Sequence, residues 1–314
     1  MKKSSSIDYL IISSAYPYRG GISDSTHSLV NQMSNQNISS EVWTFKLLYP
    51  KFFFPGKTQY SQEVLKSNFK IVRQINTLNP INWILSARKI NKISPKKVIF
   101  RYWTPLLSLS YFTISCLLNN RTKVIGLVDN WTGHEKILFE GVFRRLFIKS
   151  CDSFISFSKN VGKKLKNSTN KEVLPLFHPI NDDLPNKISK DEALSNLDLP
   201  SKKYILFIGL IRKYKGVESL IKAFHYASKE HENLKLIIAG EFYDDINIYK
   251  RLIKRKDLEN KVIIDNDFLK SSKIRDYICI SDLIIQPYKK ASQSGITPLA
   301  YYYDKPLVVS NIEG

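Results

Sequence analysis

The sequence predicts an α/β protein built from two tandem Rossmann-like domains, each with a doubly wound parallel sheet. With 314 residues the chain is too long for one ordinary core. Short runs rich in Ile, Val and Phe alternate with segments of helical periodicity, as in parallel sheets covered on both faces. The 43% of hydrophobic residues can fill two cores, which argues against disorder.

The first domain is expected at residues 1–176. It begins with a buried strand at 8–13, and the turn Tyr18-Arg19-Gly20-Gly21 leads into a helix with polar and apolar faces at 23–36. The same criteria place further strands at 41–46, 97–103, 123–128 and 153–158, and helices at 81–93, 106–118, 135–150 and 160–166.

A connector is expected at residues 177–203, because this stretch holds three prolines, paired aspartates at 182–183 and a polar, helix-like piece at 189–197. The second domain, 204–314, resumes the alternation. Its strands are expected at 204–209, 234–240, 262–265, 283–287 and 306–310, and its helices at 217–230, 246–256, 271–280 and 294–303.

Charge is unevenly divided along the chain. Residues 1–170 hold 25 Lys and Arg against 8 Asp and Glu, a net +17, whereas residues 171–314 hold 23 against 20, a net +3. The positive electrostatic field of the first domain favours a polyanionic partner: nucleic acid, an anionic membrane face or a phosphorylated substrate. The chain has no recognised nucleic-acid motif, so nucleic acid is not expected.

The three cysteines are far apart and odd in number, which predicts buried thiols in a reducing compartment rather than disulfides or a zinc site. The apolar run near the N-terminus is too short for a signal peptide, and no stretch is long enough to span a membrane. We expect a cytoplasmic protein that at most rests on the inner face of the cell membrane.

In doubly wound sheets, ligands bind beyond the carboxyl ends of the strands. That rule selects polar or glycine-bearing loops at 14–21, 129–135, 210–216, 241–245 and 288–297. No dinucleotide fingerprint and no phosphate-binding P-loop motif occurs, which disfavours a nicotinamide oxidoreductase and a P-loop nucleotidase. Cations and free backbone N–H groups at strand ends suit a diphosphate, so a nucleotide-activated substrate is expected.

Three segments carry a family resemblance: the strand and glycine loop at 11–22, the basic turn at 206–216, and the helix and strand at 295–310. In order and spacing they resemble the GT-B glycosyltransferases of family 4 (glycosyl transferases group 1). The resemblance implies a retaining hexosyltransferase that moves a sugar from a nucleotide diphosphate to a glycan or lipid-linked acceptor, in cell-surface polysaccharide or glycolipid synthesis. It implies no cofactor and no metal.

The resemblance also implies a donor site in the second domain. Lys215 matches the family's phosphate-binding lysine, and Arg212 is assigned the arginine's role although the usual position holds Leu210. Gly209 ends the strand before them. A solvated turn is the structural alternative for both cations.

This sequence differs from the family pattern at a second place. The family carries two glutamates eight positions apart, and the corresponding positions here hold Ala291 and Leu299. Neither side chain can accept a hydrogen bond from a hydroxyl. Recognition of sugar or ribose then falls to Gln293, Ser294 and Thr297. The N–H groups of Ser294, Gly295 and Ile296 at a helix start would hold phosphate, with an ordinary loop as the alternative.

In the first domain, His134 is nominated as the family's histidine near the donor sugar, with Asn130 and Glu135 in support. A structural or exposed loop histidine is the alternative. Gly20 and Gly21 would let the backbone approach phosphate or acceptor closely, and otherwise form a tight turn.

Two further motifs were weighed. Asp265-Asn266-Asp267 has the form of a metal-binding Asp-x-Asp, but a solvated turn is preferred for it. The segment Lys51-Phe52-Phe53-Phe54-Pro55-Gly56-Lys57 suits insertion at a headgroup boundary or clamping of a lipid-linked acceptor, with a packed loop as the equal alternative.

The chain stops at Gly314, where the family continues with further strands and helices, so a C-terminal truncation that leaves the second domain incomplete, with reduced stability, is expected. The missing glutamates and the early end leave a second hypothesis: a catalytically inactive or fragmentary GT-B protein that only binds nucleotide or anionic lipid.

Overall fold

The computed structural model describes residues 7–50, 54, 56–61, 67–131, 139–180 and 184–312. It forms two compact units, Met1–Asn181 and Asp182–Gly314. Each unit has its own parallel sheet and is described by itself.

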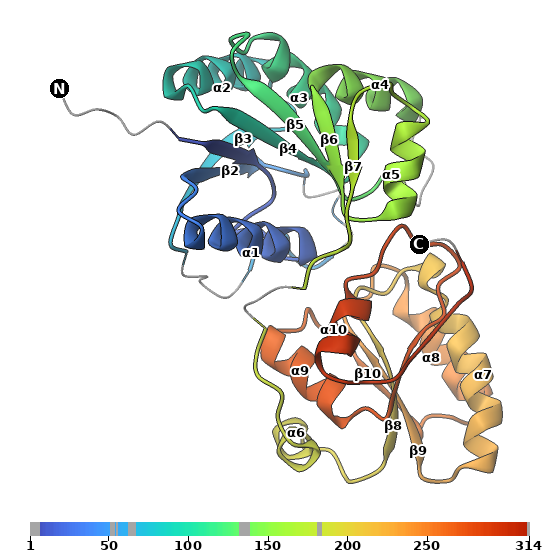
Figure 1. The fold of residues 1–314 in the computed structure, drawn as a ribbon. Coiled ribbons are helices and arrows are strands. Elements are labelled where there is room, and N and C mark those ends of the chain that lie inside the picture. The colour runs from blue at the N-terminus through green and yellow to red at the C-terminus, as the bar shows by residue number, and fades with distance from the viewer. Residues whose placement is uncertain are drawn as a thin grey trace. The chain divides into compact units, whose positions relative to one another are not determined.

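The first unit contains a seven-stranded sheet of order β3-β2-β1-β4-β5-β6-β7, with every pairing parallel (Figure 1). The order reverses between β1 and β4, which is where doubly wound sheets open a crevice for ligands. The strands are β1 Tyr9–Ile12, β2 Ser40–Leu47, β3 Lys70–Asn76, β4 Lys97–Tyr102, β5 Lys123–Val128, β6 Ser153–Ser156 and β7 Val173–Pro175.

Helices cover both faces of this sheet. The helices are α1 Gly21–Asn35, α2 Pro80–Ile93, α3 Ser108–Cys116, α4 Glu140–Ser150 and α5 Lys159–Lys166, and a 3₁₀ turn, η2 Pro105–Leu107, precedes α3. The connection through α1 moves along the sheet in the opposite direction to those through α2, α3 and α4. Right-handed crossovers therefore place α1 on one face and the other three on the opposite face, as Figure 1 shows.

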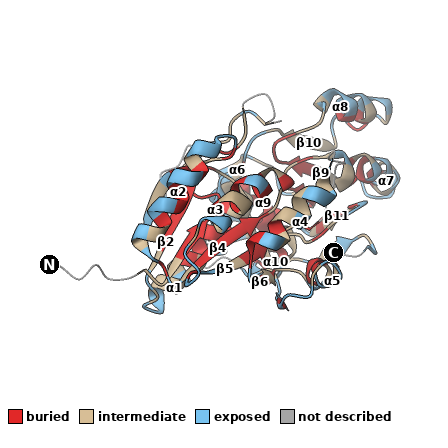
Figure 2. Ribbon diagram, turned by 90° about the horizontal axis from the view of Figure 1, so that it is seen from above, coloured by how far each residue is buried: buried red, intermediate tan, exposed pale blue. Residues whose placement is uncertain are grey.

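The core of the first unit is built around aromatic pairs. Phe100 on β4 stacks on Tyr111 of α3 with ring centroids 4.5 Å apart, and Tyr102 stacks on Phe147 of α4 at 4.1 Å. All four rings are buried, so α3 and α4 are fixed to the sheet by the side chains of a single strand. Figure 2 shows the buried sheet beneath these partly exposed helices.

The second unit contains a five-stranded parallel sheet of order β10-β9-β8-β11-β12, which reverses between β8 and β11. Its strands are β8 Lys203–Ile208, β9 Leu234–Ala239, β10 Val262–Asp265, β11 Leu283–Gln286 and β12 Leu307–Val309. Its helices are α6 Lys190–Leu197, α7 Val217–Glu230, α8 Ile246–Arg255, α9 Ser271–Ile280 and α10 Ile296–Tyr302, with a 3₁₀ turn, η3 Lys213–Lys215. Apolar clusters pack on both faces of this sheet.

The predicted fold class, two Rossmann-like parallel-sheet domains, is confirmed. The structure adds two strands that the sequence did not indicate, β3 and β7, which are the edge strands of the first sheet. It also shows that Cys116 is exposed at the end of α3, so the expectation of three buried thiols was wrong for this residue; Cys151 and Cys279 are buried. Within the described ranges, no helix combines the length and apolar composition that a membrane span needs.

Candidate functional site

The basic turn after β8 is held against the end of β11. Gly216 has φ +71°, and a Cβ built on it would lie 1.9 Å from the carbonyl oxygen of Pro287. Only glycine permits both the left-handed backbone and this close approach. The turn that carries Lys215 is thereby fixed at the point where the strand order of the second sheet reverses.

The ammonium group of Lys215 lies inside this cluster of strand ends. Its Nζ would be 3.4 Å from a Cβ on Gly209, and it lies 5.2 Å from the centroid of the Tyr288 ring. No carboxylate among the described residues forms an ion pair with it. Burial, and then the nearby charge of Arg212, lower the pKa of Lys215 from 10.5 to about 8. A poorly solvated cation that lacks an anion is a site at which an anion is bound favourably.

Arg212 belongs to the same turn. Its guanidinium lies 4.9 Å from the centroid of the Tyr243 ring, in the loop after β9, and its charge acts on Lys215. The structure therefore brings the two predicted cations together, with each packed on a tyrosine from a neighbouring strand end.

The predicted donor loop 293–297 reaches this cluster through Ile296, the first residue of α10. The Ile296 side chain would be 3.9 Å from a Cβ on Gly209. Ser294 Oγ accepts a hydrogen bond from the Ile296 N–H at 3.3 Å, and Thr297 Oγ1 lies 3.3 Å from Gln286 Nε2. Gln293 Oε1 is buried without a hydrogen-bond partner, so it remains able to accept one.

Ala291 and Leu299 stand where glutamates are expected from the resemblance, and both pack into apolar clusters of the second unit. A Cβ on Gly295 would meet no atom within 4 Å, so that part of the loop borders open space. Within the described loop 288–297, Gln293 Oε1 is a buried acceptor without a hydrogen-bond partner.

The Asp265–Asp267 motif has structural partners. The Asp265 carboxylate accepts a hydrogen bond from the Tyr277 hydroxyl at 2.7 Å and pairs with Lys273 Nζ at 2.6 Å. Asn266 Oδ1 accepts from the backbone N–H of Phe242 at 2.9 Å. The Asp265 contacts join the end of β10 to α9, and the Asn266 contact joins it to the loop after β9. In the described part of the chain no three potential metal-binding side chains converge.

The first-unit site is only partly described. His134 and Glu135 lie outside the described residues, while Asn130 follows the end of β5 and is half-buried. Gly20 and Gly21 stand at the start of α1, and a Cβ on either would meet no atom within 4 Å. Both glycines therefore face open space.

A buried ion pair beneath these loops escaped the sequence analysis. Arg101 on β4 and Asp129 after β5 form a bidentate pair, with both N–O distances at 2.8 Å. The same guanidinium donates to the hydroxyls of Ser25 and Thr26 and to the carbonyl of Ile22, all in α1. Arg101 thus ties the glycine turn to the loop that carries Asn130. The sequence signal that could have indicated this pair was the position of Arg101, a charged residue near the end of a strand expected to be buried.

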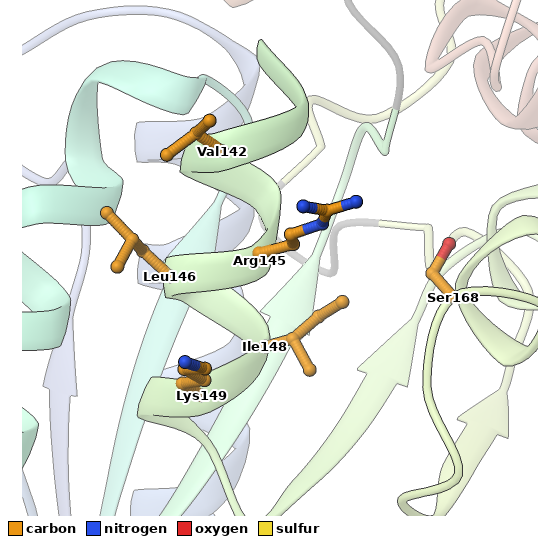
Figure 3. A pocket seen from close by; sticks show the side chains of 6 residues that line it. All are labelled: Val142, Arg145, Leu146, Ile148, Lys149 and Ser168. Atoms are coloured by element: carbon orange, nitrogen blue, oxygen red, sulfur yellow. The ribbon is translucent and has the colours of Figure 1, made fainter. Parts of the chain in front are cut away.

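Two other features lie apart from this geometry. Phe54 stacks loosely on Tyr49 at 6.5 Å, but most of the aromatic segment, residues 51–53 and 55, lies outside the described residues. A surface depression of about 330 Å³ lies beside α4 and is lined by Val142, Arg145, Leu146, Ile148, Lys149 and Ser168. In Figure 3, Arg145 and Ile148 extend from α4 toward the segment that carries Ser168.

Comparison with known families finds a match in the second unit. The model of the family "Glycosyl transferases group 1" matches residues 189–314. This stretch of the chain is therefore similar to that family. The match covers α6 and the whole cluster around Lys215. No curated protein is similar enough in sequence to count as a match.

The chain resembles solved structures over nearly its whole length. Sucrose-phosphate synthase from Thermosynechococcus elongatus aligns with a TM-score of 0.73 at 12% identity, over 98% of this chain and 82% of that one. A glycosyltransferase from Rickettsia africae gives 0.71 at 18%, over 98% and 80%. The Anabaena protein HepE, solved in complex with UDP-glucose, gives 0.70 at 12%, over 98% and 81%. These likenesses confirm the GT-B fold.

Proposed function

We propose that this protein is a glycosyltransferase that moves a hexose from a nucleotide-diphosphate sugar to a glycan or lipid-linked acceptor, with retention at the sugar carbon. The proposed setting is cell-surface polysaccharide or glycolipid synthesis in the cytoplasm, on the inner face of the membrane. One observation carries the proposal: the half-buried Lys215 ammonium, with its lowered pKa and no carboxylate partner among the described residues, lies at the strand ends of a family-matched domain. HepE, which has the same fold, was solved with UDP-glucose bound.

Lys215 and Arg212 would bind the diphosphate and offset its charge. When the bond between the sugar carbon and the phosphate oxygen breaks, the electron pair stays on the diphosphate, and cations placed there stabilise the leaving group. The acceptor hydroxyl oxygen then bonds to that carbon and releases its proton. Because two side-chain cations perform this task, we propose that the reaction needs no metal and no cofactor.

The remaining assignments follow position. Gln293, with its unpaired Oε1, would accept a hydrogen bond from a hydroxyl of the ribose or sugar. Ser294, Gly295 and Thr297 in the same loop would border the donor. In the first unit, His134, Asn130 and Glu135 would act near the donor sugar, while Gly20 and Gly21 would admit the phosphate or acceptor.

The test is a transfer assay with UDP-, GDP- and ADP-linked hexoses and membrane extracts as acceptor, with and without EDTA. Release of nucleotide diphosphate together with a labelled glycan or glycolipid supports the proposal, and it should persist in EDTA. Lys215→Met should abolish transfer, while Lys213→Met, a change to an exposed neighbour in the same turn, should not. Turnover that Lys215→Met leaves intact would contradict the assignment.

The second hypothesis remains a binding protein without turnover. The packing of Ala291 and Leu299 into apolar clusters favours it, because no carboxylate stands at those places. Nucleotide binding with no transfer from any donor sugar would support it over the enzyme.

A further inference from the structure

Three neighbouring helices of the first unit expose aliphatic side chains in their first halves. Helices α2, α3 and α4 pack side by side over one face of the sheet (Figure 2). On this face five side chains are between 38% and 68% exposed, and we call them the apolar band: Ile81, Ile84, Leu85, Leu109 and Val142. Scattered apolar residues are ordinary on surfaces, but five on adjacent helices form a patch that needs an explanation.

The second halves of α2 and α4 carry cations. Arg88 and Lys92 on α2, with Arg145 and Lys149 on α4, are exposed, and we call them the basic band. On α2 the apolar band and the basic band lie on the same face of the helix, because residues 81, 84, 85, 88 and 92 are spaced by three or four positions. Arg145 and Lys149 also border the depression beside α4, whose other walls include Val142, Leu146 and Ile148 (Figure 3).

Acidic residues are almost excluded from this face. Helices α2 and α3 contain no Asp or Glu. Residues 64–128 contain none either, and of the eleven Lys and Arg in that range only Arg101, Lys70 and Lys96 pair with a carboxylate among the described residues, all away from the basic band. On α4 the one acidic residue, Glu140, lies 3.9 Å from Arg144. The surface therefore combines aliphatic groups with an unbalanced positive charge.

We propose that this face of α2, α3 and α4 docks on an anionic lipid bilayer. Aliphatic side chains can enter the boundary between headgroups and acyl chains, while the Lys and Arg stems let the charges reach lipid phosphates. Nucleic acid suits the face less well, because binding of single strands relies on aromatic side chains that stack on bases. This surface is separate from the segment 51–57, whose predicted membrane contact stays a prediction, and its docking does not require the transferase activity.

The docking would also orient the proposed reaction. All three helices start at the carboxyl end of the sheet, so the apolar band lies toward the edge that carries the glycine turn and the loop with Asn130. A bilayer at this band would bring a lipid-linked acceptor to that edge. This last step rests on the proposed function, whereas bilayer binding itself does not.

The test is flotation of the full chain with vesicles of phosphatidylcholine alone, or with about one third phosphatidylglycerol, in the absence of any donor sugar. We expect binding only to the anionic vesicles, weakened by salt. Ile81→Ser with Leu85→Ser should reduce binding about fivefold or more. Arg88→Gln with Lys92→Gln should reduce it roughly twentyfold, since each cation near an anionic surface strengthens binding about fivefold.

Matched controls come from the near-neutral second unit. Tyr226→Ser with Ile248→Ser, and Lys254→Gln with Arg255→Gln, also change exposed side chains and should leave flotation unchanged. If a change on α2 impairs folding, Val142→Ser with Arg145→Gln tests the same face from α4. Absence of binding, or binding that survives the changes on α2 and α4, would overturn the proposal. Loss of oligonucleotide binding in the same variants, with vesicle binding unaffected, would assign the face to nucleic acid instead.

Discussion

Replacing Lys215 with methionine should stabilise the second unit while removing its phosphate-binding cation. Burial and Arg212 lower the pKa of Lys215 from 10.5 to about 8 in the folded protein. Below pH 8 the lysine is charged in both the folded and the unfolded state, so the desolvated cation lowers the free energy of unfolding. A shift of this size corresponds to about 3 kcal/mol at neutral pH. Because the side chain is half-buried and contacts Tyr288, we expect Lys215→Met to raise the free energy of unfolding by about 1–3 kcal/mol.

The dependence on pH has a defined sign. As pH rises from 8 through 10.5, Lys215 loses its proton first in the folded state and then in the unfolded state, and the cost disappears. The stability difference between Lys215→Met and the unchanged protein should therefore be largest below pH 8 and shrink toward zero above 10.5.

Urea unfolding followed by far-UV circular dichroism measures this difference. Tryptophan fluorescence would miss the second unit, because all four tryptophans, Trp43, Trp83, Trp103 and Trp131, lie in the first. Lys213→Met is the control and should leave stability within about 0.5 kcal/mol. A less stable Lys215→Met protein at pH 7, or a difference that does not change with pH, would refute the reasoning.

Three further outcomes are expected. Arg101→Met leaves Asp129 buried without its partner and should cost about 3–5 kcal/mol in urea unfolding followed by tryptophan fluorescence; a cost under about 1 kcal/mol would contradict the buried pair. Gly216→Ala places a Cβ against a carbonyl at a positive φ and should lower the stability of the second unit by about 3 kcal/mol, whereas Gly295→Ala, which has φ −70° and open space, should leave stability unchanged. In the native protein Cys116 should react rapidly with a thiol reagent, and the two buried cysteines only after unfolding; equal reaction of all three would be inconsistent with the core.

Much of the fold was readable from local patterns. The strand Lys123–Val128 and the helices Val217–Glu230 and Ser271–Ile280 begin and end at the predicted residues, because apolar runs and helical periodicity are local properties. The edge strands Lys70–Asn76 and Val173–Pro175 were missed for a physical reason. The first carries a charged or polar residue at four of seven positions and the second has only three residues, so both depend on pairing with a neighbouring strand.

The candidate site was readable in part. The rule that ligands bind at strand ends selected the loops that carry Lys215 and Ile296, and the structure brings both residues to Gly209 at the end of the preceding strand. Tyr288 lies in another selected loop, but its packing on the Lys215 ammonium was not predicted, because the contact joins residues far apart in sequence across the reversal of strand order. The buried pair of Arg101 and Asp129 is likewise a tertiary contact that no local pattern indicates.

The central claim is that the cluster around Lys215 binds the diphosphate of a nucleotide sugar. Calorimetric titration of the full chain with UDP, GDP and ADP, and with their hexose conjugates, tests it most directly. We predict that at least one nucleotide binds, that Lys215→Met weakens this binding roughly thirtyfold or more, and that Lys213→Met leaves it unchanged. Absence of binding by any of these nucleotides, or binding that Lys215→Met does not weaken, would contradict the account.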